Sequence, residues 1–167
     1  MLIRHFQPDD APVLRAIFHD SIHGLARANY SAAQLEAWAP AEHDTDGWLR
    51  RMRAIAPLVA QVEGELAGFA DLQNDGYIDM FFVSPRHARR GVGTALMRRL
   101  LDAAREAALT SVYSNVSLTA EPFFAGHGFT VERRNEVAVR GAVLRNATMR
   151  LHLPAEQTVP HSAPLGV

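Results

Sequence analysis

The stretch that decides the fold is GYIDMFFVSPRHARRGVGTALMRRLLDAAR, from Gly76 to Arg105. Its first part, Tyr77 to Val83, is rich in aromatic and β-branched residues and is bounded by turn formers, which predicts a buried strand. From Thr94 to Ala108, apolar residues recur every three or four positions, which predicts a helix. A short basic segment and the run Gly91-Val92-Gly93 lie between them. The unit is therefore a strand, a basic glycine-containing loop and a helix.

The loop before this helix suits a phosphorylated ligand. The first N–H groups of a helix have no intrahelical acceptor, and the helix dipole is positive at that end. Glycines let an anion approach these groups because they carry no Cβ. Arg86, Arg89 and Arg90 add positive charge nearby. A lone Gly-x-Gly is a weak motif, and its alternative interpretation is a turn whose glycines only relieve strain. The surrounding Arg-Arg-Gly-x-Gly-x-Ala-Leu context favours phosphate binding.

The segment FVSPRHARRGVGTALMRRLL, which starts at Phe82, resembles the acetyl-CoA-binding motif of the GCN5-related N-acetyltransferases, the GNAT superfamily. That family shows Gln/Arg-x-x-Gly-x-Gly/Ala after a strand that ends in Val-x-Pro. Gly91 and Gly93 are in register with the motif, whereas Ala88 stands where Gln or Arg is usual. This departure removes one side chain and leaves the backbone amides intact. The resemblance extends over residues 2–153.

The resemblance implies an α/β (α+β) fold, with a mixed, mostly antiparallel sheet, helices on both faces and parallel central strands that splay apart. The pantetheine arm of acetyl-CoA would enter this gap and bond to the backbone of Phe82 and Val83. The residues whose amides would hold the pyrophosphate are Arg89, Arg90, Gly91, Val92, Gly93 and Thr94. Asn115 would belong to the opposite wall, together with Phe124, which lies in a segment resembling the family's Phe-Tyr-x-x-x-Gly-Phe signature.

Composition agrees with one globular domain. The chain has 167 residues, 48% of them hydrophobic, which is enough for one packed core and short for two. A net charge of −1 gives no basic field for nucleic acid or an anionic membrane. No apolar run is long enough to span a membrane, and the N-terminus lacks a signal-peptide pattern, so the cytoplasm is the expected location. We expect a domain over residues 1–154 and a disordered tail over 155–167, where prolines recur without periodicity.

The remaining chain alternates helix and strand signals. Ser31 and Gln34 form a capping box, and Asp44 or Asp46 can cap a third helix. The predicted strands are 1–6, 58–62, 65–72, 111–116, 129–139 and 142–152, and the predicted further helices are 8–28, 32–39, a third through residue 56, and 120–127. The strand at 111–116 should run parallel to the central one because a helix connects them.

Acetyl transfer to an amine needs a group that removes a proton from the nitrogen. Asp79 is the first candidate, because a charge within an apolar strand requires an explanation and because it matches an acidic position in polyamine and aminoglycoside members of the family. Its alternative interpretation is a structural pair with an arginine. The departing thiolate needs a hydrogen-bond donor, which most of the family supplies from the tyrosine that Phe124 replaces here. Tyr113 and Ser117 are the substitutes we consider, and each has a structural interpretation as well.

The acceptor site is expected to involve the region between the first strand and the first hairpin, where its candidate residues are His19, His23, Tyr30 and Trp38. Phe81 is a further candidate, because strand alternation places it on the same face as Asp79. His19 and His23 have the spacing of a two-histidine metal site, but no third ligand is near, so we expect no metal. Trp38, between Tyr30-Ser31 and Pro40, lies in a segment similar to one in a subgroup of uncharacterised bacterial acetyltransferases. Its alternative interpretation is a core anchor.

Together with these patterns, the resemblance to the GNAT superfamily implies an acetyl-CoA-dependent N-acetyltransferase, which we expect to act on a primary amine of a small molecule. The chain has no cysteine, which leaves direct transfer in a ternary complex. The alternatives are a non-catalytic acyl-CoA-binding module and an N-acetyltransferase for peptides or proteins. A P-loop nucleotide enzyme is disfavoured because no Gly-Lys-Ser/Thr follows the glycines. We expect no nucleic-acid or membrane partner, and edge strands of the last hairpin could pair in a homodimer.

Overall fold

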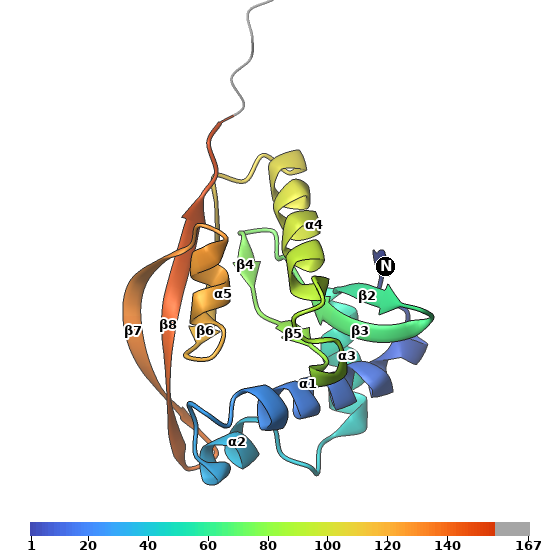
Figure 1. The fold of residues 1–167 in the computed structure, drawn as a ribbon, viewed down its shortest axis with the longest axis vertical. Helices are drawn as coiled ribbons and strands as arrows, with labels where there is room; N and C mark the ends of the chain where they lie inside the picture. The colour runs from blue at the N-terminus through green and yellow to red at the C-terminus, as the bar shows by residue number, and fades with distance from the viewer. Residues whose placement is uncertain (156–167) are drawn as a thin grey trace, which may run out of the picture.

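A computed structural model describes residues 1–155, so the predicted disordered tail lies, from residue 156 on, outside the described residues. The strands form two four-stranded sheets (Figure 1). The first sheet has the order β1 (Leu2–His5), β2 (Leu58–Val62), β3 (Glu65–Ala70), β5 (Phe81–Val83), and the second β4 (Tyr77–Ile78), β6 (Ser111–Ser117), β8 (Ala142–His152), β7 (Thr130–Val139). The helices are α1 (Ala11–Leu25), α2 (Ala32–Trp38), α3 (Thr45–Ile55), α4 (Val92–Glu106) and α5 (Glu121–Gly126).

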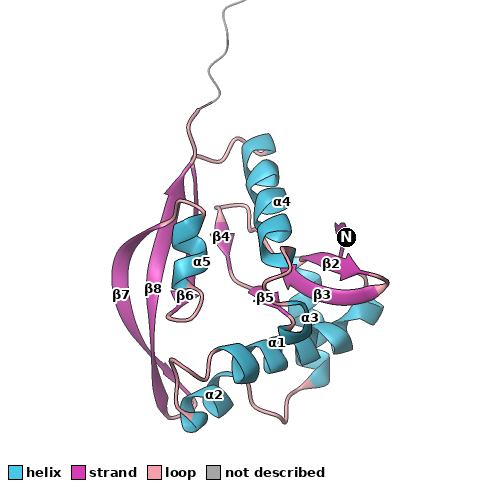
Figure 2. Cartoon of the chain, in the orientation of Figure 1, coloured by secondary structure: helices cyan, strands magenta, loops and turns pink. Residues whose placement is uncertain are grey.

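Helices cover both faces of the first sheet (Figure 2). Side chains alternate along β2 and β3, so that Val59 and Phe69 pack with α1, α2 and α3. Ala60 and Ala70 face the other way and pack with α4. The predicted α/β fold with helices on both faces is therefore confirmed. No helix within residues 1–155 has the length and hydrophobicity needed to cross a membrane.

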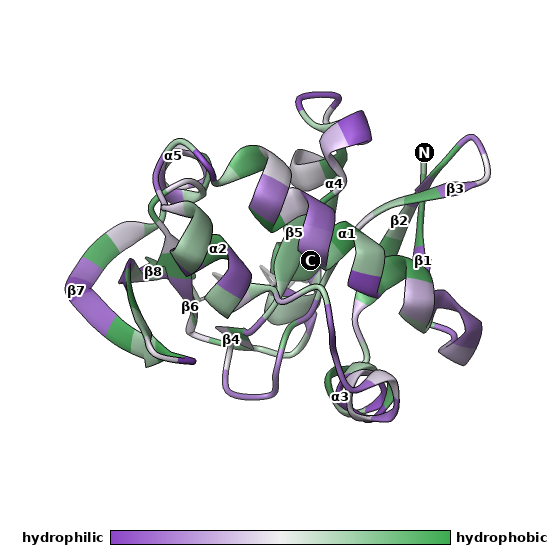
Figure 3. Cartoon of the chain, turned by 90° about the horizontal axis from the view of Figure 1, so that it is seen from below, coloured by the Kyte–Doolittle hydropathy of each residue, from purple (hydrophilic) through white to green (hydrophobic). Residues whose placement is uncertain are grey.

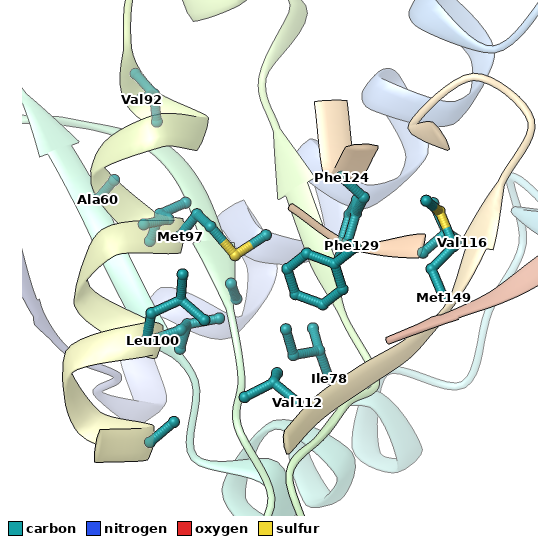
Figure 4. Close-up of a cluster of buried hydrophobic side chains, with 14 of the residues drawn as sticks. Ala60, Ile78, Val92, Met97, Leu100, Val112, Val116, Phe124, Phe129 and Met149 are labelled. Carbon is teal, nitrogen blue, oxygen red and sulfur yellow. The ribbon is translucent and has the colours of Figure 1, made fainter. Parts of the chain in front are cut away.

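The larger core joins α4 to the second sheet. Figure 4 shows Met97 and Leu100 pointing from α4 toward Phe129 and Ile78. All four side chains are at most 2% exposed. Burial of this size stabilises the fold by about 1.5–3 kcal/mol per side chain. The core therefore fixes α4, and with it the loop at its start, against both sheets.

The central strand is not continuous, which corrects the prediction of one strand from Tyr77 to Val83. β4 pairs in parallel with β6, and β5 pairs antiparallel with β3. At the break, the backbone N–H groups of Asp79 and Met80 donate to Oδ1 of Asp71, at 3.1 and 2.6 Å. Asp71 follows β3 and is only 1% exposed. This buried carboxyl satisfies the two amides that leave the ladder, and the chain crosses there from one sheet to the other.

Most other elements lie where the sequence predicts them. The turns at Glu63-Gly64 and Arg140-Gly141 both have two successive positive φ angles, as tight hairpin turns require. Asp44, not Asp46, caps α3, because its side chain accepts from the N–H of Gly47. The first helix ends at Leu25 instead of Ala28 and begins with a 3-10 turn. In Figure 3, β5 near the centre and β2 to its right are coloured largely as hydrophobic, whereas hydrophilic and hydrophobic residues alternate along the outer strand β7.

Candidate active site

A cleft of about 620 Å³ separates β5 and the start of α4 from β6 and α5. β5 is an edge strand of its sheet, so the backbone groups on its far side face this cleft instead of another strand. The residues around the cleft belong to α1, α2, β5, the loop before α4, and the β6–α5 segment: Ser21, Ile22, Leu25, Ala26, Trp38, Phe81, Phe82, Val83, Ala88, Arg89, Gly91, Gly93, Thr94, Ser117, Thr119, Ala120, Phe123 and Phe124.

The loop before α4 lines one end of the cleft with residues from Ala88 to Thr94. Arg89 and Gly91 both have left-handed backbone conformations, with φ of 61° and 82°. The first hydrogen bond of the helix runs from the N–H of Ala95 to the carbonyl of Gly91, at 3.0 Å. The N–H groups of Val92, Gly93 and Thr94 come before this bond and have no acceptor within the helix. This is an amide-rich, dipole-positive corner that suits an anion.

The two glycines of the loop have different structural roles. A Cβ on Gly91 would meet nothing within 4 Å, so the residue is required for its positive φ. A Cβ on Gly93 would lie 3.2 Å from the ring of Phe123. Gly93 therefore leaves room for the ring of Phe123, from α5, against the start of α4.

The predicted coenzyme residues are largely brought together. Seven of them line the cleft: Phe82, Val83, Arg89, Gly91, Gly93, Thr94 and Phe124. Arg90 is exposed beside the loop, and the side chain of Val92 is buried in the core beneath it. Asn115 does not line this cleft; it lies in the neighbouring cavity, where its Oδ1 accepts from the hydroxyl of Thr148.

A second cavity, of about 670 Å³, lies on the other side of Phe82. Trp38, Phe82 and Ser117 line both cavities, so the two spaces adjoin at these side chains. The second cavity contains most of the polar and charged groups of the site: Arg15, Tyr30, Glu42, His43, Asp44, Arg51, Asp79, Asn115, Arg140, Arg145 and Asn146.

Asp79 lies in the wall of this second cavity. One carboxylate oxygen accepts from Nη2 of Arg51 at 2.8 Å, so the structural pairing with an arginine is present together with exposure to the cavity. Behind it, burial raises the pKa of Asp71 to about 6, against the hydrogen bonds that the carboxyl accepts from Met80 and Gln73. Two carboxyl groups, one buried and one facing the cavity, therefore flank the strand break.

Of the two substitute donors, only Ser117 lies at the cavities. It lies at their junction, where its Oγ accepts from the N–H of Ala120 at 3.1 Å. Tyr113 is brought to neither cavity. Its hydroxyl donates to Asp75 at 2.7 Å, and its ring lies under the guanidinium of Arg150. Phe124 is buried and carries no hydroxyl.

The predicted acceptor residues divide into two groups. Tyr30 lines the second cavity, and its hydroxyl donates to the carbonyl of Arg145 and accepts from the N–H of Leu118. Trp38 lies at the junction, and Phe81 lines only the coenzyme cleft. His19 and His23 stack on each other at 4.2 Å and line neither cavity. Among residues 1–155, no three His, Asp or Glu side chains gather as metal ligands.

Four arginines and one acid of the site were not foreseen from the sequence: Arg15, Arg51, Arg140, Arg145 and Asp71. The arginines come from α1, α3 and the last hairpin, and only the fold brings them together. Arg15 did give a signal, because it lies between Leu14 and Phe18 on the buried side of α1, where a lone cation requires an explanation.

Two sheets that separate at their central strands, with an amide-rich helix start at the mouth of the gap, define an acyl-coenzyme A-dependent acyltransferase. The Acetyltransferase (GNAT) domain family matches residues 26–153 of the chain. The uncharacterised N-acetyltransferase YafP of Escherichia coli strain K12 is 35% identical over 148 residues, which cover 89% of this chain and 93% of that protein. The chain belongs to the GNAT family and is an acyltransferase.

Solved structures of similar fold include a GCN5-related N-acetyltransferase from Rhodopseudomonas palustris, with a TM-score of 0.87 and 36% identity over 91% of this chain and 95% of that one. The acetyltransferase yncA of Salmonella typhimurium, solved with acetyl-CoA, has a TM-score of 0.68 and 21% identity, and the match covers 98% of this chain and 99% of that one. The second match is a likeness of fold.

Proposed function

We propose that this acyltransferase moves the acetyl group of acetyl-CoA to a primary amine of a small molecule. The observation that carries the proposal is the pair of adjoining cavities, which meet at Trp38, Phe82 and Ser117. One has an amide-rich mouth and apolar walls, and the other has charged walls. An acyl donor in the first and an amine in the second would bring their reacting atoms together at the junction, and this proximity is a large part of catalysis.

The cleft residues fit acetyl-CoA by their chemistry. The amides from Arg89 to Thr94 would receive the pyrophosphate, and the free edge of β5 would bond to the amides of the pantetheine arm. The acetyl thioester would then lie between Phe82 and Ser117. Bound there, acetyl-CoA supplies an activated acyl carbon whose C–S bond breaks as the new C–N bond forms.

Asp79 would act on the amine. An amine is protonated at neutral pH and becomes a nucleophile only after it loses a proton. The carboxylate of Asp79 faces the acceptor cavity, so it can take this proton directly or through one water molecule. Arg51 would hold the carboxylate in place through their hydrogen bond.

Ser117 would donate a hydrogen bond to the departing thiolate. It lies at the junction, and its Oγ already accepts from the N–H of Ala120, which directs its proton elsewhere. Tyr113 lies away from the cavities, so we assign it no step. Phe124 would pack against the donor without donating. The missing hydroxyl at Phe124 also favours a second candidate, a non-catalytic acyl-CoA-binding module.

Release of free thiol from acetyl-CoA, measured with a panel of primary amines, tests the proposal. We expect turnover with at least one small amine, and Asp79→Asn should lower kcat/KM at pH 7 by roughly 100-fold or more. Its dissociation constant for CoA should be unchanged. Asp75→Asn is the matched control, because that carboxyl is exposed and lines neither cavity.

Three outcomes of this assay can be told apart. CoA binding without turnover of any amine would support the binding module. Turnover of peptides but not of small amines would move the acceptor to a macromolecule. Full activity of Asp79→Asn would remove this residue from the proton transfer.

A further inference from the structure

Of the four arginines that line the acceptor cavity, two have no carboxylate partner among residues 1–155. Arg51 pairs with Asp79 at 2.8 Å, and Arg145 pairs with Glu136 at 3.5 Å. Within residues 1–155, Arg15 and Arg140 form no ion pair with a carboxylate inside 4.0 Å. Arg15 is buried, and a buried guanidinium without an anion is costly unless a ligand supplies the charge.

The two arginines are held in place by main-chain carbonyls of one short segment. Nη2 of Arg15 donates to the carbonyl of Pro40 at 2.5 Å. Nη1 of Arg140 donates to the carbonyl of Ala37 at 2.8 Å. Each guanidinium thereby uses one N–H for positioning and retains other donors, because an arginine has five. Two cations from α1 and from the β7–β8 turn therefore converge on the same wall.

Burial makes Arg15 the stronger of the two anchors. Its side chain is only 6% exposed, and the rings of Phe18 and Trp48 lie 5.2 and 5.8 Å from its guanidinium carbon. Desolvation lowers the pKa of Arg15, and the positive charge of Arg140 lowers it further, which places the two charges within each other's field. Glu36 acts on Arg15 only from a distance; its carboxylate accepts from the N–H of Ala41.

The coenzyme's own phosphates do not account for this pair. Arg15 and Arg140 line the acceptor cavity and not the coenzyme cleft, whose basic residue is Arg89. The other carboxylates of the cavity are Asp44, which caps α3, Asp79, which pairs with Arg51, and the exposed Glu42. A second cation at Arg15 would be repelled, so a polyamine does not fit this wall.

We propose that the amine substrate carries an oxyanion, most simply a carboxylate, which Arg15 and Arg140 bind while its amino group lies near Asp79. This inference rests on the proposed function, because it places the amine in the same cavity. The substrate class is then a zwitterionic amino acid or a similar anionic amine. Guanidinium groups suit such a ligand because their planar donors match a carboxylate or phosphate in a bidentate manner.

Matched pairs of ligands test this inference. α-Amino acids, lysine and ω-amino acids of increasing length are each compared with their carboxamide, which lacks the negative charge; in the longer ω-amino acids this change leaves the pKa of the distant amine nearly unaltered. Taurine and phosphoethanolamine replace the carboxylate by a sulfonate and a phosphate, and so identify the oxyanion. We expect the preferred acid to exceed its carboxamide by about 10-fold or more in kcat/KM.

Arginine variants then test whether Arg15 and Arg140 bind the oxyanion. Arg15→Gln should remove most of this acid-to-amide ratio, and Arg15→Lys should retain part of it. The CoA dissociation constant should not change in either. Arg140→Gln, at an exposed position, should lower the same ratio and serves as the test where Arg15→Gln does not fold. Arg53→Gln, on the exposed side of α3 and in neither cavity, is the control.

A binding measurement keeps the two proposals separate. N-acetyl amino acids and N-acetyl amino amides are titrated into the CoA-loaded protein, which requires no turnover. Preferential binding of the acids without any turnover would support the oxyanion site and overturn the enzymatic proposal. Equal binding and equal turnover of acids and amides, or a ratio that survives both arginine variants, would overturn the oxyanion site.

Discussion

The residue whose titration matters most for stability is Asp71, at the break in the central strand. Burial raises its pKa in the folded protein to about 6, from the ordinary value of 3.8 for an aspartate. The folded state therefore holds a proton that the unfolded state releases between these two values. The free energy of unfolding should fall as pH rises from about 4 to about 6, by up to about 3 kcal/mol, and the loss should persist above that range.

Asp71→Asn tests this directly. The amide oxygen can still accept from the N–H groups of Asp79 and Met80, but it no longer titrates. Urea unfolding between pH 4 and pH 7 should show a flatter stability profile for the variant than for the wild type. Asp75→Asn should leave the fall in place, because that exposed carboxyl has a lowered pKa. If the free energy of unfolding of Asp71→Asn fell with pH as steeply as that of the wild type, another group would be responsible for the loss of stability.

At the scale of single residues, the sequence predicts motifs whose residues are close together in the chain. It does not predict which distant residues meet in the folded protein. Gly91 and Gly93 were predicted because a glycine loop before a helix is a local pattern. Arg15 and Arg140 lie far apart in the chain and meet only because α1 and the last hairpin pack around the Ala37–Pro40 segment. No spacing rule connects such residues, so an anion site of this kind cannot be predicted from one sequence.

At the scale of elements, the approach of the Phe123 ring of α5 to the start of α4 depends on Gly93. We expect Gly93→Ala to destabilise the fold by about 1–3 kcal/mol and to weaken CoA binding, because the added Cβ meets the ring of Phe123. Gly126→Ala is the matched control within α5, since its Cβ would meet nothing within 4 Å. It should be neutral or stabilising by up to about 1 kcal/mol. Similar urea midpoints for the two variants would contradict the close contact.

The elements differ in how far the sequence determines them. The hairpins at Glu63-Gly64 and Arg140-Gly141 are predictable because a two-residue turn with positive φ angles is a local property. The division of the central strand is not, because it depends on the side chain of Asp71, which lies eight and nine residues away, just after β3. The apolar pattern of Tyr77 to Val83 indicates burial, and burial alone does not tell which sheet each half joins.

At the scale of the molecule, the two sheets and α4 form a frame around the junction of the two cavities. The larger core fixes α4 against the second sheet, and the strand break separates β5 from β6. β7 is the outer strand of its sheet, with the exposed side chains of Val131 and Val137 on it, and would be the strand that pairs in a homodimer. Elements from α1 to β8 thus contribute residues to the site.

Calorimetric titration of the protein with CoA most directly tests the claim that the loop before α4 binds the coenzyme. We predict measurable heat at a ratio of about one CoA per chain, a higher Tm with CoA present, and clearly weaker binding by Gly91→Val, because a β-branched residue is strained at a φ of 82°. An absence of both heat and thermal shift in the wild type, or undiminished affinity in Gly91→Val, would contradict it.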